Sequence, residues 1–267
     1  MDFGLSNELK MLQKAVRDFA KKKIAPNVDE WDKNHYLPYE EVLKPMGELG
    51  FFGSVIPEEY GGSDMGFMAA AIITEEIARV SSSLRVQYNM LGMGTALTIY
   101  RYGTEEIKQK YVPKLCSAEY LGGFAITEPD AGSDVMAIAT IAEDKGDHWL
   151  LNGSKTWISN AKQSDIIICY AYTDREKRGK GLSAFVLETK NLEGISTTDL
   201  DKMGSLSSPT GEIFLNNVKV PKENILGEPG DGAKIVFNSL NQTRLSAAAG
   251  AVGAAQACLD MATEDAK

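Results

Sequence analysis

The sequence predicts an α+β fold with an N-terminal α-helical domain, a middle antiparallel β-barrel domain and the start of a C-terminal helical bundle. Three observations support this prediction. Apolar residues recur at intervals of three and four up to about residue 120. Short segments rich in branched and aromatic residues follow, separated by turn residues. Helical periodicity then returns to the end of the chain. We therefore expect three domains, at 1–120, 121–229 and 230–267.

The first domain is predicted to open with an amphipathic helix. Leu5, Leu9, Leu12, Val16 and Phe19 share one face of a helix, and the preceding serine at position 6 is a preferred N-cap residue. A proline at position 26 ends this pattern. Further helices are expected at 38–50, 68–79, 87–102 and 104–115.

The middle domain is predicted to be a set of short strands. Asn152-Gly153 separates two of them and favours a two-residue hairpin turn, because both residues tolerate positive φ. The expected strands are 122–127, 138–143, 148–151, 154–159, 166–172, 182–187 and 211–215.

The last segment is predicted to be one long helix that begins near Gly232 and is rich in alanine. Its apolar face is wide, so it requires other helices to cover it. No further helix follows within the 267 residues, so we expect the C-terminal helical bundle to be cut off partway.

Composition narrows the classes of function. A net charge of −9 disfavours a nucleic-acid partner. Cys116, Cys169 and Cys258 are odd in number and far apart, which argues against a disulfide framework and a zinc site, and we expect no metal. The sequence contains no run of about eighteen apolar residues, so no membrane span is expected. The start has no leader-like pattern, so a cytoplasmic location is expected.

Two neighbouring motifs carry the chemistry. Residues 124–134, FAITEPDAGSD, bring a hydroxyl, a proline-centred turn and a Gly-Ser-Asp end together. Residues 157–160, WISN, place a large aromatic face beside a small hydroxyl. The first motif offers polar groups to a phosphate-bearing cofactor, and the second offers a surface to a flat ring.

The order of these motifs resembles the acyl-CoA dehydrogenase family. The correspondence runs through essentially the whole chain. Each matching motif is short and weak alone, and the motifs gain strength from occurring together in the family's order. The matching pieces are EEYGG at 58–62, AITEP at 125–129, GSD at 132–134, LNGSK at 151–155, WISN at 157–160, VPKENILG at 220–227 and TR at 243–244.

The resemblance implies FAD as the cofactor. Thr127 would present its hydroxyl to the pyrimidine edge of the flavin, Trp157 would cover the ring, and Ser159 would lie near the nitrogen that accepts hydride. Taken alone, Trp157 and Ser159 could equally be structural residues of a strand. The implied cofactor-binding residues are Phe124, Ala125, Ile126, Thr127, Ser133, Trp157, Ile158 and Ser159.

A narrower resemblance, to glutaryl-CoA dehydrogenases, rests on Arg85 in residues 78–86, ARVSSSLRV. That subgroup has an arginine at the inner end of the acyl pocket, where a guanidinium can pair with the distal carboxylate of the substrate. The alternative is a surface arginine in a Ser-rich turn. The implied substrate-binding residues are Arg85, Val86, Ser133, Phe237, Asn241, Thr243 and Arg244.

The chain departs from the decarboxylating members of that subgroup at two positions. They carry a glutamate and a serine beside the arginine, and this chain has Ala78 and Val86. We therefore expect dehydrogenation of glutaryl-CoA to glutaconyl-CoA without the decarboxylation that follows in those members.

No catalytic residue is assigned within the chain. The family uses a glutamate base that lies in the last helical domain, or in some subgroups at the position of Thr243, and threonine cannot serve as that base. We expect the base to lie beyond Lys267. The family also implies a homotetramer and electron transfer to an electron-transfer flavoprotein.

Three alternatives remain open. The enzyme could act on a non-dicarboxylic acyl-CoA. It could be a flavin oxidase or monooxygenase on the same fold, in which case oxygen would reoxidise the reduced flavin rapidly. It could also be a non-catalytic fragment that binds FAD or CoA.

Overall fold

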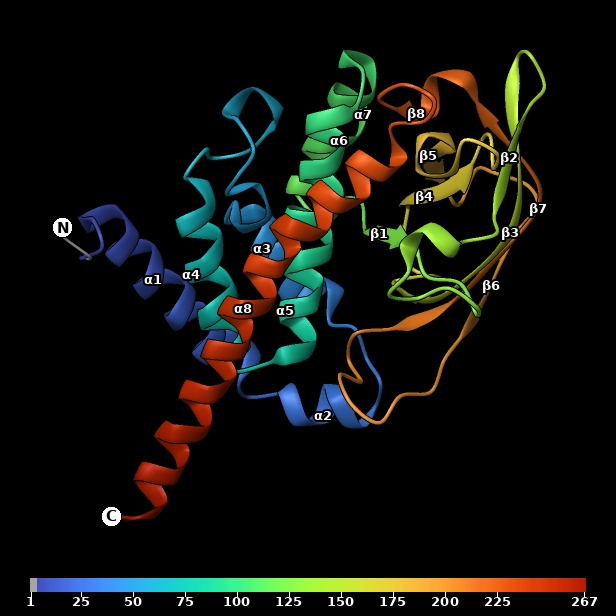
Figure 1. Cartoon of the computed structure of the whole chain (residues 1–267). Helices are drawn as coiled ribbons and strands as arrows, with labels where there is room; N and C mark the ends of the chain where they lie inside the picture. The colour runs from blue at the N-terminus through green and yellow to red at the C-terminus, as the bar shows by residue number, and fades with distance from the viewer. Residues whose placement is uncertain (1–3) are drawn as a thin grey trace.

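The chain folds into a helical part and a sheet that lie side by side, and one long helix crosses from the sheet along the helical part (Figure 1). This computed structural model describes residues 4–267. Positions 1–3 belong to the expected first domain and to the N-terminal segment in which no leader pattern was found, and they lie outside the described residues. The predicted α+β class is confirmed.

The helical part forms where the apolar period predicts it. Ser6 caps the first helix by accepting a hydrogen bond from the Leu9 amide at 3.3 Å, as its position before the helix favours. The α-helices of this part are α1 (Asn7–Phe19), α2 (Val28–Lys33), α3 (Lys44–Glu48), α4 (Gly66–Ala78), α5 (Ser82–Tyr88), α6 (Leu97–Tyr102) and α7 (Glu105–Cys116).

Within residues 4–267, three segments are π-helical, at Ala20–Ile24, Tyr39–Leu43 and Asn89–Ala96. The last joins α5 to α6, so the helix expected over 87–102 is one helical stretch with a widened middle. Such segments are rare and often mark functional sites. In this chain the widened middle lies against β1.

The described part of the chain forms a sheet of eight strands. Seven follow the order β6-β7-β3-β2-β4-β5-β8, and β1 pairs with β4. Most pairings are antiparallel as expected, whereas β1–β4 and the single β2–β4 pair are parallel. The strands are β1 (Gly122–Ala125), β2 (Ile141–Asp144), β3 (His148–Ser159), β4 (Ile166–Tyr172), β5 (Leu182–Glu188), β6 (Ile195–Asp199), β7 (Thr210–Pro221) and β8 (Ile225–Leu226).

The predicted hairpin at Asn152-Gly153 is wrong. Both residues lie inside β3, which runs unbroken from His148 to Ser159 and pairs with β7 along its length. The register shifts between Leu151 and Gly153, where Asn152 faces both Asn216 and Asn217, so the extra residue of this bulge lies in β7 and Asn152-Gly153 form no turn. The sequence prediction also missed α2 and β6.

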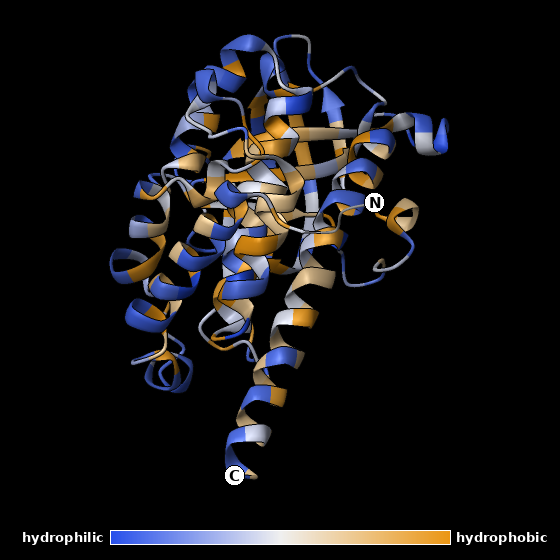
Figure 2. Ribbon diagram, turned by 90° about the vertical axis from the view of Figure 1, so that its left-hand side faces the viewer, coloured by the Kyte–Doolittle hydropathy of each residue, from blue (hydrophilic) through white to orange (hydrophobic). Residues whose placement is uncertain are grey.

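Helix α8 (Gly232–Asp265) is the long helix expected at the end of the chain. It packs along the α5–α6 region and then along α4, which it contacts from Ser246 to Gly253, and its far end projects beyond the body of the molecule (Figures 1 and 2). By length and composition alone it could cross a membrane, although core helices of soluble proteins pass the same test. The absence of a membrane span therefore stays a prediction.

Candidate functional site

The two motifs meet along one face, which we call the ring-binding face and define as Thr127, Trp157 and Ser159. Thr127 follows β1, and the other two residues end β3. The Thr156 amide donates to the Thr127 carbonyl at 2.9 Å, so the loop after β1 is held against β3. Residues thirty positions apart thus share one surface, as the two motifs together predict.

Trp157 is held in an unusual backbone conformation. Its φ is +59°, in the left-handed region that a bulky residue rarely adopts. The register between β3 and β7 shifts between Lys155 and Ile158, and this bulge turns the indole outward, leaving it 59% exposed. Strain of about 1–3 kcal/mol at one residue is typical of functional sites.

A cavity of about 180 Å³ lies on one side of this tryptophan. Its lining is mostly apolar, and serine and threonine hydroxyls from β3 and α8 supply the polar atoms. It contains no carboxylate. The lining residues are Met90, Phe124, Ile126, Trp157, Ser159, Ser239, Leu240 and Thr243.

A wider hollow of about 500 Å³ is also lined by Trp157. The Thr127–Gly132 loop forms most of it, and Thr156 and Glu212 complete it. The tryptophan therefore borders both an apolar cavity and a polar hollow. A flat ring with a polar tail fits this arrangement.

The ring-binding face fits the FAD that the family resemblance implies. Neither the Thr127 hydroxyl nor the Ser159 hydroxyl has a hydrogen-bond partner among residues 4–267. Each lines a hollow, so both are available to a ligand. Free hydroxyls beside an exposed indole are the groups that orient a flat heteroaromatic ring.

Arg85 is a partly buried cation without a partner. Its side chain has no hydrogen bond or ion pair within residues 4–267, and desolvation lowers the pKa of its guanidinium. It lies against Gly250 of α8, where an added Cβ would be 3.0 Å from the Arg85 Cδ and Nε atoms. A desolvated, unpaired guanidinium calls for an anionic ligand.

Helix α8 connects the apolar cavity to this arginine. Ser239, Thr243, Ser246 and Gly250 follow one another at intervals of four, three and four, so they share one helix face. Thr243 lines the cavity and Gly250 contacts Arg85, with about 10 Å of helix rise between them.

A buried amide network joins α5 to the end of β3. Gln87 donates to Asn160 at 2.9 Å and to Ser208 at 3.0 Å, and Asn160 donates back to Gln87 at 2.8 Å. Gln87 is two residues from Arg85, and Asn160 follows Ser159. The network therefore fixes the arginine relative to the ring-binding face.

The other predicted site residues lie at varied depths. Ala125 and Ile158 are buried in the core of the sheet, so only their main-chain atoms could reach a cofactor. Val86, next to Arg85, is half-buried. Outside the two hollows, Ser133, Phe237, Asn241 and Arg244 are exposed, and Arg244 donates to the Asn241 side chain at 2.6 Å.

The sequence interpretation missed two groups near the site. Met90 lines the apolar cavity from the π-helical segment. Arg175 and Arg178 line a third hollow of about 350 Å³ beside Met136 and Tyr172. The cluster of basic residues at 175–180 could have revealed this hollow. Residues 4–267 contain no acidic, histidine or cysteine cluster able to hold a metal ion.

Comparison with known proteins gives a consistent result. The family model described as acyl-CoA dehydrogenase, N-terminal domain, matches residues 6–119, and the one described as acyl-CoA dehydrogenase, middle domain, matches residues 123–218. A glutaryl-CoA dehydrogenase from Desulfococcus multivorans is 69% identical over 264 residues, which are 98% of this chain and 68% of that protein.

Two solved structures are similar throughout the chain. A glutaryl-coenzyme A dehydrogenase in complex with glutaryl-CoA has a TM-score of 0.98 and 69% identity, over 99% of this chain and 67% of that one. A glutaryl-CoA dehydrogenase from Mycobacterium smegmatis in complex with FADH2 has a TM-score of 0.90 and 30% identity, over 96% and 64%. The chain thus spans about two thirds of the length of these relatives.

Proposed function

The chain belongs to the acyl-CoA dehydrogenase family, whose members are FAD-dependent oxidoreductases, and from that premise we propose that it dehydrogenates glutaryl-CoA to glutaconyl-CoA. The observation that carries the substrate assignment is Arg85, a desolvated guanidinium without a partner in the described chain. It lies at the far end of the helix face that starts in the apolar cavity.

The ring-binding face would hold FAD, and FAD would supply the hydride acceptor. Trp157 would cover the ring, because its backbone conformation turns the indole outward. The Thr127 hydroxyl would be a donor for the pyrimidine edge, where negative charge builds up on reduction. Ser159 provides a second hydroxyl on the side of the apolar cavity.

The acyl chain would lie in the apolar cavity between Trp157 and α8. Dehydrogenation removes a proton from the α-carbon and a hydride from the β-carbon, and the double bond forms between them. Excluding water from this cavity strengthens the interactions that polarise the thioester. Arg85 orients the substrate by pairing with its distal carboxylate through two parallel donors.

A carboxylate base completes the proposed mechanism, and we place it outside the described cavity lining. The lining contains no acid, and Thr243 occupies the position at which some subgroups of the family carry the base. The hydroxyl of Thr243 donates to the Leu240 carbonyl at 3.1 Å and is therefore already engaged within α8. The base is expected from residues beyond Lys267.

The surroundings of Arg85 support a reaction that stops before decarboxylation. Ala78, buried at 4% exposure, and Val86 stand where the decarboxylating members carry a glutamate and a serine. Without these two polar groups, Arg85 meets the distal carboxylate without a competing acid. Tight pairing stabilises the carboxylate before reaction, and this stabilisation is lost when carbon dioxide leaves, so the pairing opposes decarboxylation.

The coenzyme would extend towards the loop at 175–180. Arg175 donates to the Ile138 carbonyl at 3.1 Å, and its guanidinium lies 5.8 Å from the centre of the Tyr172 ring. Arg178 lines the same hollow. Two guanidinium groups facing one hollow are suited to phosphate groups, and CoA carries such groups at the end away from the thioester.

The physiological setting is also part of the proposal. We expect electrons to pass to an electron-transfer flavoprotein, the enzyme to assemble as a homotetramer, and the location to be cytoplasmic. The exposed apolar positions of α8, such as Val252 and Leu259, are consistent with a helical partner in the assembled protein.

An anaerobic titration of the holoenzyme with glutaryl-CoA tests the proposal. We expect loss of the oxidised-flavin absorbance and formation of glutaconyl-CoA. Bleaching only by a plain acyl-CoA such as butyryl-CoA would reject the dicarboxylic substrate. Crotonyl-CoA and carbon dioxide as the main products would reject the non-decarboxylating assignment. Rapid reoxidation of the reduced flavin by air would favour an oxidase.

A further inference from the structure

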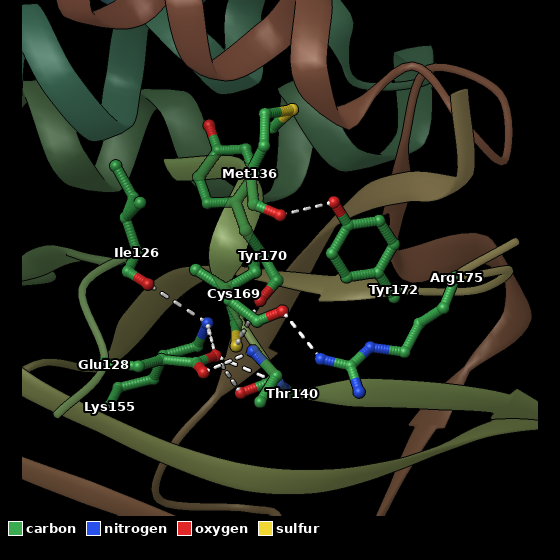
Figure 3. A network of polar contacts seen from close by, with 11 residues as sticks. Ile126, Glu128, Met136, Thr140, Lys155, Cys169, Tyr170, Tyr172 and Arg175 are labelled. Carbon is green, nitrogen blue, oxygen red and sulfur yellow. Dashed lines mark hydrogen bonds and ion pairs between the residues drawn. The ribbon is translucent and has the colours of Figure 1, made fainter. Parts of the chain in front are cut away.

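A buried ion pair lies directly behind the ring-binding face. Lys155 Nζ is 2.8 Å from Glu128 Oε1, and the two side chains are 0% and 6% exposed. Glu128 follows Thr127 in the chain, and Lys155 precedes Trp157 by two positions. Figure 3 shows the pair beneath the segment that begins at Ile126, with Thr140 and Cys169 beside it.

The Glu128 carboxylate is fully satisfied. Besides Lys155, it accepts hydrogen bonds from the backbone amides of Ala139 and Thr140 and from the Thr140 hydroxyl. Burial acts to raise the pKa of Glu128, but Lys155 and the Thr140 and Ala139 donors outweigh it, so the pKa lies below its ordinary value. The carboxylate is charged and immobile.

Lys155 ties the same carboxylate to the segment that carries Thr127. Its ammonium donates to the Ile126 carbonyl at 3.2 Å, while the next amide, of Thr156, donates to the Thr127 carbonyl at 2.9 Å. Three consecutive residues, 126–128, are therefore anchored to one stretch of β3. Glu128 and Thr156 also line the polar hollow, so these anchors border the space that the ring-binding face encloses.

A glycine of β3, beside the bulge of β7, makes this arrangement possible. Gly153 has a φ of +154°, and a Cβ on it would lie 2.4 Å from Thr140 Oγ1. Only glycine permits this approach, which lets the Thr140 hydroxyl reach Glu128. The residues mistaken for a hairpin turn thus support the ion pair.

Stability alone does not explain a buried pair here. Replacing such a pair with apolar residues is often neutral or stabilising, because both charges lose their hydration on burial. A fully satisfied polar network instead fixes one geometry. The geometry fixed by this network is that of the Thr127 segment.

We propose that Lys155 and Glu128 are positioning residues for the flavin, because they hold residues 126–128 so that the Thr127 hydroxyl faces the ring. This inference rests on the proposed FAD site and adds two residues that act on the ring through the backbone they anchor. The pair acts only through the main chain of Ile126 and through the placement of Thr127.

The test uses three variants of the holoenzyme: Lys155→Met, Glu128→Gln and the double variant. Each single variant leaves one buried group without its partner and is expected to lower the melting temperature. The double variant removes both charges and is expected to regain most of the melting temperature. All three are expected to bind FAD about tenfold more weakly and to shift the visible absorbance of the bound flavin.

The Arg17–Glu76 pair provides a matched control. Glu76 is 1% exposed and accepts two hydrogen bonds from Arg17, in the helical part of the chain. Glu76→Gln is expected to lower the melting temperature and to leave the flavin spectrum and FAD affinity unchanged. An effect of Glu76→Gln on the flavin equal to that of Glu128→Gln would overturn the inference.

The decisive comparison is the double variant. If it recovers both the melting temperature and the wild-type FAD affinity and spectrum, the pair is only structural and the inference fails. Wild-type protein that binds no FAD would reject the proposed function itself. Wild-type protein that binds FAD and is bleached by acyl-CoA, with variants of unchanged spectrum, would reject only the positioning role.

Discussion

Lys155 and Arg85 are both cations removed from water near the candidate site, but Lys155 has hydrogen-bond partners for its charge and Arg85 has none in the described chain. Lys155 is 0% exposed and bonded to Glu128 and to the Ile126 carbonyl. Arg85 is half-buried and has no side-chain partner among residues 4–267. A satisfied buried cation holds the protein in one geometry, whereas an unsatisfied one is available to a ligand.

The largest expected difference between the two cations is in stability. Lys155→Met should lower the free energy of unfolding by about 3 kcal/mol, because it leaves Glu128 buried without its counterion. Arg85→Met should change the free energy by less than about 1 kcal/mol, or raise it, because no partner is lost. Denaturant unfolding of the two variants measures both values. Equal losses of unfolding free energy in the two variants would contradict the distinction between a paired and an unpaired cation.

The second difference concerns substrate choice. Arg85→Met should lower kcat/KM for glutaryl-CoA about 100-fold, since it removes a charge-assisted contact to the distal carboxylate. Turnover of butyryl-CoA, which has no such carboxylate, should be unchanged. Arg85→Lys is the matched control. Its kcat/KM for glutaryl-CoA should lie between those of the wild type and Arg85→Met, because lysine keeps the charge and loses the paired donors. A parallel loss for both substrates would contradict the assignment.

A smaller effect is expected at Gly250, which makes room for Arg85. Gly250→Ala places a methyl group 3.0 Å from the Arg85 Cδ and Nε atoms and should shift the guanidinium. We expect kcat/KM for glutaryl-CoA to fall about fivefold, with butyryl-CoA unaffected. In an Arg85→Met background the same change should add nothing, which a double-mutant cycle would show.

The smallest expected effect is on how the melting temperature changes as the pH is lowered. Because the folded pKa of Glu128 lies below the ordinary value of 4.5, its carboxylate contributes stability above that pH and loses it as the pH falls through the lower folded value. The neighbouring Cys169 thiol, whose pKa burial raises to about 11, stays neutral in this range. The double variant Lys155→Met/Glu128→Gln should therefore show a shallower acid limb in melting temperature.

Arg85→Met provides the contrast for this pH experiment. Arg85 faces no carboxylate within the described chain, so its removal should leave the slope of the acid limb unchanged. A flattened limb in Arg85→Met would reveal an acidic partner and would weaken the case for a free anion-binding group.

Much of the fold follows from local pattern. The helices and most strands lie where apolar period predicts them, and Ser6 caps α1 as its position requires. The failures have local causes. Asn152-Gly153 has the composition of a turn, but pairing with β7 keeps both residues in a strand, and the extra residue of the nearby bulge lies in β7. The short helix α2 and the exposed strand β6 have weak periodicity.

The site was harder to predict than the fold because its parts are brought together by topology. The sequence places Thr127 and Trp157 in suggestive motifs, and their meeting depends on the backbone bond between β3 and the loop after β1. Nothing in a sequence pattern links Glu128 to Lys155, 27 positions later, or Arg85 to Gly250. Both contacts join separate elements of the fold.

The reciprocal amide pair between Gln87 and Asn160 has a consequence for motion. Each amide donates to the other, and both side chains are fully buried, so α5 cannot separate from the end of β3 without exposing four polar atoms at once. Local opening should therefore be shared by the two segments. Their slowest backbone amides should exchange hydrogen at a common rate, as one cooperative unit, although 73 positions separate them in the chain.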